Sequence, residues 1–179
     1  MLLRTPRLLL REFTAHDAPV LRAYQADPRY LRFSEVEDWG EGESRALLRC
    51  FLEWQREQPR GNFQLAIELS ASGELIGNVG LRRDSSWDRT AELGFELSPA
   101  HWGHGYATEA AHTLLDYGFR DLLLHRVEAR CVAENLGSVG VLERVGLRRE
   151  GTLREAEFFR GRWWDVHLYG ILVSDWAFA

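Results

Sequence analysis

The stretch from Leu93 to Ala111, LGFELSPAHWGHGYATEAA, is the feature that most constrains the fold of this chain. A strand-like alternation runs into a loop that contains Gly103 and Gly105, and a helical pattern begins directly after them. Glycines let the backbone turn sharply and approach a ligand closely, and the first turn of a helix carries about half a positive charge. The stretch therefore predicts a strand, an anion-binding turn and a helix; a glycine-eased turn without a ligand is the alternative.

Two other phosphate-binding motifs do not fit this stretch. A Walker A loop requires GxxxxGK[ST], and no lysine follows these glycines. A dinucleotide-binding fingerprint requires a third glycine where Thr108 stands, and an acidic residue at the end of a second strand about 20 residues further on. Here that distance falls on residues 119–123, at the end of the predicted helix. Backbone amides holding a pyrophosphate remain the better interpretation.

Hydrophobic periodicity predicts alternating strands and helices along the rest of the chain. The predicted strands cover residues 7–12, 62–69, 75–83, 90–97, 126–132, 147–159 and 164–172, with a polar loop at 84–88. The predicted helices cover residues 14–25, a short piece after Asp27-Pro28, 44–57, 105–119 and 136–145. This order predicts an α/β chain with a mixed sheet and helices on both faces, and one domain over residues 1–179.

Composition excludes several classes of protein. The chain has 179 residues, 45% hydrophobic and 27% charged, and no apolar run approaches the roughly 20 residues that span a bilayer. With no signal peptide in view, we expect a cytoplasmic protein that does not bind membranes. The formal net charge of −5 argues against general nucleic-acid binding. Cys50 and Cys131 are expected to be reduced and buried, and no metal is expected because no spacing suggests a zinc site.

Four motifs in order resemble the GNAT superfamily of acetyltransferases, and within it the RimJ/RimL branch that acetylates protein N-termini. The superfamily pattern [QR]xxGx[GA] is similar to Trp102, Gly105 and Ala107, with tryptophan at the first position as in this branch. The other matches are TPRLLLR near the start, NLGS followed by LERVGL and REG after Asn135, and the closing stretch from Glu157 to Tyr169. The resemblance covers nearly the whole chain.

This resemblance implies a fold and a cosubstrate. The fold is a central mixed, mostly antiparallel sheet of about seven strands, in which one strand pair splays apart to admit acetyl-CoA, and no metal is needed. The strand edge would pair with the pantetheine arm, and the loop amides would take the pyrophosphate. The residues implied in cofactor binding are Phe95, Glu96, Leu97, Trp102, Gly103, His104, Gly105, Tyr106, Ala107, Thr108, Asn135, Ser138 and Arg144.

The resemblance also implies direct attack of a primary amine on the thioester, without an acyl-enzyme. Glu157 matches the carboxylate proposed as the base in the RimL type, and Ser138 matches the hydroxyl proposed to protonate the departing thiolate. Glu92 is the competing base, because some GNAT enzymes carry theirs on this strand. From the residues alone, Asn135 with Ser138 is also a plain helix cap, and Glu157 is also a solvated strand carboxylate beside an arginine.

The amine acceptor is the least determined part. An α-amino group, with a pKa of about 7.7–8.0, asks less of a base than a lysine side chain at about 10.4. The acidic stretch Glu35 to Glu43 would border the acceptor site and attract a cation, or would be an ordinary solvated loop. We expect a protein or peptide N-terminal α-amine. A polyamine or aminoglycoside, or an acyl-CoA-binding module without catalysis, is the alternative, in a monomer or homodimer.

Overall fold

The computed structural model describes residues 1–83 and 88–176, so most of the polar loop expected at 84–88 lies outside the described residues. None of the described helices is long and apolar enough to cross a membrane. The strands are β1 (Leu2–Arg4), β2 (Leu8–Glu12), β3 (Phe63–Leu69), β4 (Leu75–Arg82), β5 (Thr90–Leu97), β6 (Arg126–Val132), β7 (Arg148–Phe159) and β8 (Arg162–Leu172). The helices are α1 (Ala18–Gln25), α2 (Pro28–Leu31), α3 (Glu41–Trp54), α4 (Tyr106–Arg120), α5 (Leu136–Arg144) and α6 (Val173–Trp176), with 3-10 turns at Ala15–Asp17 and Pro99–His101.

The strands form one eight-stranded sheet in the order β1-β2-β3-β4-β5-β6-β8-β7. All neighbours are antiparallel except β5 and β6, so the expectation of a mixed, mostly antiparallel sheet is confirmed. The sheet has eight strands instead of about seven because β1 adds an edge, with Leu3 opposite Leu10.

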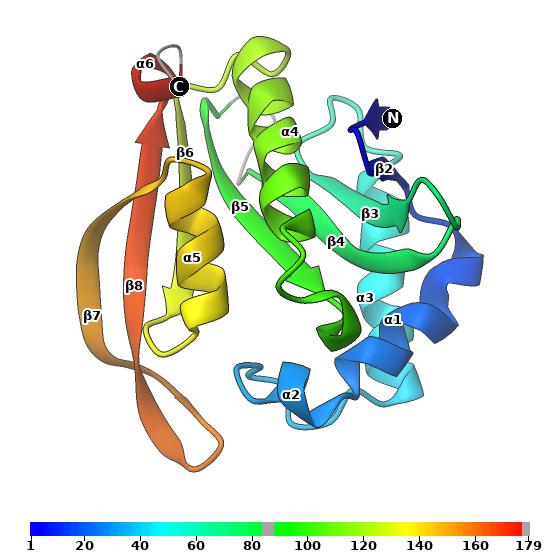
Figure 1. Ribbon diagram of the computed structural model, residues 1–179, viewed down its shortest axis with the longest axis vertical. Helices are drawn as coiled ribbons and strands as arrows, with labels where there is room; N and C mark the ends of the chain where they lie inside the picture. Colours follow the sequence, from blue (N-terminus) through cyan, green and yellow to red (C-terminus); the bar gives the residue numbers. More distant parts are fainter. Residues whose placement is uncertain (84–87, 177–179) are drawn as a thin grey trace.

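Helices cover both faces of the sheet, as the order of elements predicted (Figure 1). Strand side chains alternate between the faces, so each face collects its own apolar residues. Ala91, Leu93 and Leu97 of β5 share one core with α4. Phe13 and Ala66 share a second core with α1 and α3 on the other face. The two faces therefore offer separate surroundings for two ligands.

The sheet divides between β5 and β6. Only Thr90–Glu92 pairs with Arg126–Glu128, while β5 stays paired with β4 as far as Leu97, and β6 stays paired with β8 as far as Val132. Figure 1 shows the two strands side by side at one end and well apart at the other. The segment of β5 after Glu92 therefore has a free edge, which is the splayed pair that the resemblance implies.

Two local expectations need correction. The third helix begins at Glu41 after Gly40, not at Ser44, because Ser44 is 1% exposed and its hydroxyl donates to Gln25 Oε1 at 3.4 Å. Its apolar stripe includes Leu48 and Phe51, and Cys50 lies off that stripe, so Cys50 is exposed instead of buried.

Candidate active site

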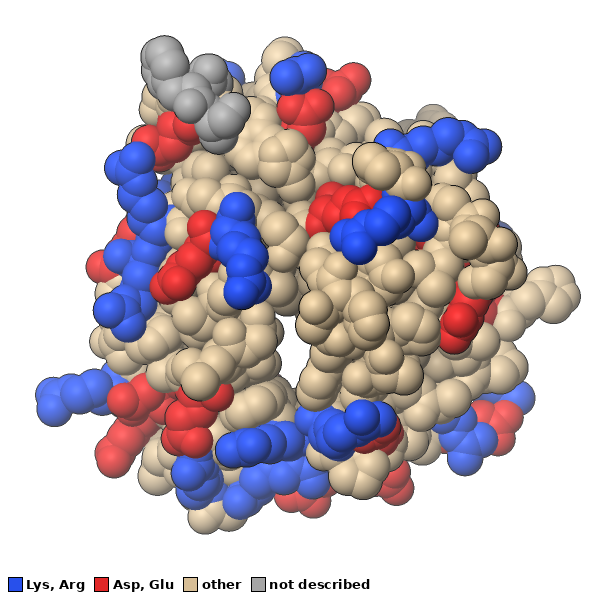
Figure 2. Space-filling view, in the orientation of Figure 1, with Lys and Arg blue, Asp and Glu red and all other residues tan. Residues whose placement is uncertain are grey.

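A cavity of about 310 Å³ lies in the split between β5 and β6. The space-filling view shows the molecule hollowed between its two halves at this place, with arginine side chains around the opening (Figure 2). The wall is built from β3, β4, the two diverging strands, α3 and α5, with Trp39 from the segment before α3. Its lining residues are Trp39, Leu47, Phe51, Gln64, Asn78, Arg82, Glu92, Leu93, Gly94, Phe95, Glu96, Ala129, Arg130, Cys131, Ser138 and Leu142.

The glycine loop leads into α4 on the face opposite α3. Gly103 and Gly105 have φ angles of 79° and 78°, the left-handed region that side chains rarely adopt, and Gly105 is the N-cap of α4. Among the described residues, no atom outside Gly103 and its two chain neighbours lies within 4 Å of a Cβ built at Gly103. Trp102, at the position where the superfamily pattern has Gln or Arg, donates its indole N–H to Leu97 O at 2.9 Å. The indole therefore ties the loop to the end of β5.

An arginine brace holds this loop from the N-terminal segment. Arg7 Nη1 donates to His104 O at 2.9 Å, and Arg7 Nε donates to Glu109 Oε2 at 2.6 Å. The Arg7 guanidinium also lies 4.7 Å from the centre of the Tyr106 ring. Burial acts to raise the pKa of Glu109, but the hydrogen bonds from Thr5 and Arg7 outweigh it and lower that pKa. The TPRLLLR motif, matched in the sequence without a role, supplies this brace.

The opposite wall carries the predicted leaving-group acid. Asn135 Oδ1 accepts from Ser138 N at 3.2 Å, so the helix cap that the sequence suggested is confirmed. Ser138 also lines the cavity, which lets cap and site coexist. Arg144, on the last turn of the same helix, donates to Gly140 O at 3.2 Å, and its guanidinium stays close to the helix surface.

Glu157 is separated from the cavity by Arg130. Its Oε1 accepts from Arg130 Nη2 at 3.3 Å, and Arg130 lines the cavity. Burial, followed by the negative charge of Glu35, raises the pKa of Glu157, and Arg130 only partly opposes them. A raised pKa makes this carboxylate a stronger base than an ordinary glutamate.

Glu92 lines the cavity directly, as the last residue of β5 that pairs with β6. Its Oε1 lies 3.4 Å from Arg82 Nη2, and its side chain is 48% exposed. The structure therefore brings Glu92 and Ser138 into one cavity and places Glu157 behind Arg130.

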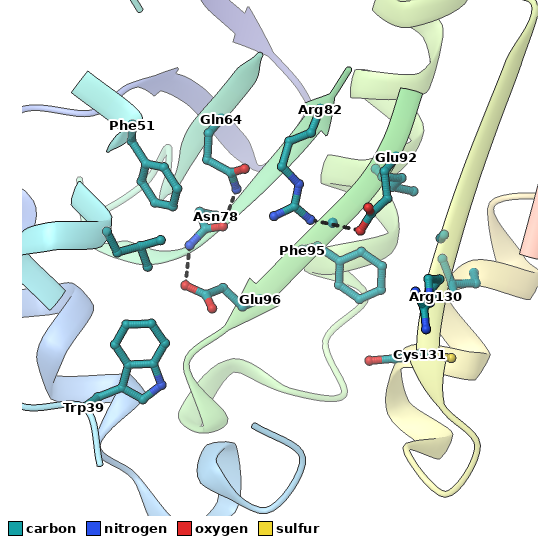
Figure 3. Close-up of a pocket in the computed structure, with 16 residues that line it drawn as sticks. Trp39, Phe51, Gln64, Asn78, Arg82, Glu92, Phe95, Glu96, Arg130 and Cys131 are labelled. Carbon is teal, nitrogen blue, oxygen red and sulfur yellow. Dashed lines mark hydrogen bonds and ion pairs between the residues drawn. The ribbon is translucent and has the colours of Figure 1, made fainter. Parts of the chain in front are cut away.

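The Glu96 side chain lies on the α1–α3 face, away from Phe95 (Figure 3). Its Oε1 accepts from Tyr24 Oη at 2.8 Å and from Gln25 Nε2 at 2.9 Å. Asn78 Nδ2 and Tyr30 Oη donate to the same carboxylate. Its backbone belongs to the predicted strand edge, but its side chain faces the α1–α3 side of the sheet.

Gln64, Asn78 and Arg82 were not singled out from the sequence, although all three line the cavity. No local signal marks Gln64, because it stands at a polar position between the apolar residues Phe63 and Leu65 of an alternating strand. Only the structure shows that Gln64 and Asn78 are 2% and 3% exposed. Buried polar residues on a sheet face that should be apolar point to a ligand or a network.

The acidic stretch borders the cavity through Trp39, which lines it. Arg160 Nη2, in the β7–β8 turn, donates to Val36 O at 3.0 Å and to Glu37 O at 3.1 Å, so the hairpin fixes this stretch. In β8, which follows this turn, Trp163 and Trp164 are adjacent in sequence. Trp164 is 6% exposed and stacks on Phe159, which makes it a core residue. Within residues 1–83 and 88–176, no group of three or more His, Cys, Asp or Glu side chains is arranged to hold a metal ion.

Comparison with known proteins decides the family. The sequence profile described as "Acetyltransferase (GNAT) domain" matches residues 7–148. The chain belongs to the GNAT acetyltransferases. Over 176 residues it is 32% identical to "Uncharacterized N-acetyltransferase p20" of Bacillus licheniformis, with 98% of each chain covered. It is also 33% identical to the ribosomal-protein-serine acetyltransferase of Escherichia coli, over 57% of each chain.

Solved structures of this family carry coenzyme A. The spermidine N-acetyltransferase of Vibrio cholerae in complex with CoA and spermine is 26% identical, with a TM-score of 0.82 over 97% of this chain and 99% of that one. RimJ of Mycobacterium smegmatis in complex with CoA-disulfide is 27% identical, with a TM-score of 0.80 over 94% of this chain and 83% of that one. This GNAT protein is an N-acetyltransferase, and acetyl-CoA is its cosubstrate.

Proposed function

We propose that this protein, as one domain over residues 1–179, transfers acetyl from acetyl-CoA directly to the α-amine of a peptide or protein N-terminus. The observation that carries the proposal is the split cavity. It lies where β5 and β6 separate, with Ser138 and Glu92 in its wall and buried polar side chains on its α1–α3 side, and the glycine loop follows the free segment of β5 on the α4 face. A cosubstrate and an acceptor can therefore approach the same point from opposite faces of one sheet.

The residues present fit acetyl-CoA. The free edge of β5 from Phe95 to Leu97 would pair with the amide groups of the pantetheine arm. The loop amides from Gly103 to Thr108, at the start of α4, would take the pyrophosphate. His104, Tyr106 and Ala107 belong to this loop, Trp102 anchors it, and Asn135 and Arg144 would assist from α5.

The reaction forms one bond, breaks another and moves a proton from nitrogen to sulfur. The amine nitrogen bonds to the acetyl carbon, the bond from that carbon to sulfur breaks, and one proton leaves the nitrogen while the sulfur gains one. Glu157, or Glu92 as its competitor, accepts the proton from nitrogen. Ser138 gives a proton to the departing sulfur. Backbone N–H groups of β5 would stabilise the developing oxyanion.

An α-amine suits this site because its pKa of about 7.7–8.0 leaves roughly a tenth neutral at pH 7. A carboxylate with a raised pKa, such as Glu157, can then serve as the base. A small polyamine is the second candidate. One observation favours it: Glu96 forms no ion pair with any basic side chain among residues 1–83 and 88–176.

The test is calorimetric titration of acetyl-CoA, followed by free-thiol release against ribosomal-protein N-terminal peptides, spermidine and an aminoglycoside. All 22 basic side chains of the chain are arginine, so no lysine amine of the enzyme competes with the acceptor. Peptide-dependent release supports the proposal. Release with spermidine alone moves the function to the second candidate, and binding without any release leaves an acyl-CoA-binding module.

A further inference from the structure

Two polar atoms on the α1–α3 side of the cavity have no hydrogen-bond partner among the described residues. Gln64 Oε1 is an acceptor on a side chain that is 2% exposed, and Arg82 Nε is a buried donor. Both residues line the cavity (Figure 3). Unpaired buried polar atoms are rare in folded proteins because they are costly, so this pair points to a ligand that satisfies both.

Two glycines hold the pair in place. Gly80 of β4 and Gly94 of β5 are register partners. A Cβ built at Gly80 would lie 2.1 Å from Gln64 Oε1, and one built at Gly94 would lie 2.2 Å from Arg82 Nη2. The Gln64 amide and the Arg82 guanidinium therefore lie across the two glycines, on adjacent strands. A side chain at Gly80 would displace the Gln64 amide, and one at Gly94 would displace the Arg82 guanidinium.

Glu96 determines which atom Gln64 presents to the cavity. A carboxylate only accepts hydrogen bonds, so Asn78 must turn its Nδ2 toward Glu96. That leaves Asn78 Oδ1 to accept from Gln64 Nε2 at 2.6 Å. The remaining Gln64 atom, Oε1, is then left without a partner among the described residues. The relay from Glu96 through Asn78 to Gln64 fixes the unpaired atom as an acceptor.

An acceptor beside a donor matches an extended polypeptide backbone. The N–H and the C=O of one extended residue point to the same side of the chain, whereas a protonated polyamine offers N–H groups and no acceptor. We propose that Gln64 and Arg82 bind the backbone N–H and C=O of the second residue of a polypeptide acceptor. Its N–H donates to Gln64 Oε1, and its C=O accepts from Arg82 Nε. Glu96 is a positioning residue for this contact, and the inference rests on the proposed function because it names the acceptor class.

The experiment compares three acceptors that share one N-terminal residue. The first has ordinary peptide bonds, and the second has an ester in place of the first peptide bond and lacks the N–H of residue 2. The third has, in addition, an alkene isostere in place of the second peptide bond and so lacks the C=O of residue 2 as well. The peptide-to-ester ratio of kcat/KM reports the N–H contact, and the ester-to-alkene ratio reports the C=O contact. In the wild type each ratio is expected to be roughly tenfold.

Variants assign each ratio to a residue. Gln64→Leu should bring the peptide-to-ester ratio to about one, and Arg82→Met should do the same to the ester-to-alkene ratio. Arg4→Met, on the exposed edge strand β1, is the matched control and should leave both ratios unchanged. Glu96→Gln should lower the peptide-to-ester ratio severalfold, whereas Tyr30→Phe, which keeps the carboxylate, should not.

Three results would overturn the inference. Equal kcat/KM for all three acceptors and spermidine would mean that the cavity does not recognise a peptide group. An equal loss with every acceptor in both variants would mean that Gln64 and Arg82 only support the fold. If no thiol is released with any amine, calorimetry of the peptide in the presence of CoA decides. Binding that depends on Arg82 keeps the inference and removes the proposed function, and no binding removes both.

Discussion

The cofactor end and the acceptor face of the cavity are built in opposite ways from the same sheet. The cofactor end is one continuous stretch, Trp102 to Glu109, joined to the end of β5 and braced by Thr5 and Arg7 of the N-terminal segment. The acceptor face takes Gln64, Asn78 and Glu96 from three different strands. These residues meet only because the strand register places them on the same side.

This difference teaches where specificity resides in such a chain. A local stretch can be recognised in sequence and tolerates few changes, because each residue depends on its immediate neighbours. A face assembled by register can change one residue at a time without disturbing the sheet, since its members are side chains on a common backbone. We therefore expect the cofactor end to decide whether the chain is an acetyltransferase, and the acceptor face to decide which amine it uses.

The largest effect is expected at the cofactor end, from Gly105→Val. A side chain at a φ of 78° forces the loop to rearrange, and the amides aimed at the pyrophosphate lose their direction. Losing two hydrogen bonds to a charged group should weaken acetyl-CoA binding about 1,000-fold by calorimetry. Gly73→Val, at a φ of 72° in the β3–β4 turn, is the matched control and should keep wild-type affinity. Unchanged affinity in Gly105→Val would remove the loop from the cofactor site.

The next effect separates chemistry from binding. Glu157→Gln and Ser138→Ala should each lower kcat about 100-fold, the usual size of a general acid or base contribution. The Kd for acetyl-CoA should stay within severalfold of wild type. Glu155→Gln, an exposed glutamate on the same strand, is the control. If Glu92→Gln loses turnover and Glu157→Gln keeps it, Glu92 is the base.

Arg7→Met tests whether the brace matters to the cofactor end alone. Without its bonds to His104 and Glu109, the loop should be less ordered, and acetyl-CoA should bind about tenfold more weakly. The acceptor KM at saturating acetyl-CoA should not change, and Arg4→Met should behave as wild type. A change in acceptor KM of the same size would show that the two regions are coupled.

The smallest effect is a shift in pH dependence. The charge of Glu35 helps to raise the pKa of Glu157, so removing it in Glu35→Gln should lower that pKa. The base works when deprotonated, so the acid limb of the kcat profile should move to lower pH by a fraction of a unit. Arg130→Met should move it the other way, because Arg130 lowers the pKa. If the acid limb stays at the same pH in both variants, Glu157 does not set it.

The order and faces of the elements could be predicted because they follow from local periodicity. The strand at 90–97 and the strand at 126–132 have the predicted bounds. The third helix was predicted to begin three residues late, since Gly40 caps it without a side chain and Ser44 resembles a cap. β1 was missed because three residues, Leu2–Arg4, are too short for a periodic pattern and depend on pairing with β2.

In the candidate site, too, residues in local motifs could be predicted and residues brought together by strand pairing could not. Gly103, Gly105 and Ser138 lie in contiguous motifs, and the structure places Ser138 in the cavity wall and the two glycines in the loop before α4. Gln64 and Arg82 are ordinary residues in their own strands. Their shared role depends on two register partners, Gly80 and Gly94, which no single segment of sequence reveals.

The split between β5 and β6 also bears on how this protein resists aggregation. An unpaired strand edge on a protein surface is a template on which another chain can add a strand. Here the unpaired edge after Glu92 faces β6 across a cleft inside the molecule. A slender ligand with two amide groups can reach that edge, whereas a β-strand of a second molecule would need room on both sides. The protein can thus keep backbone groups ready for its cosubstrate without offering them to its own copies.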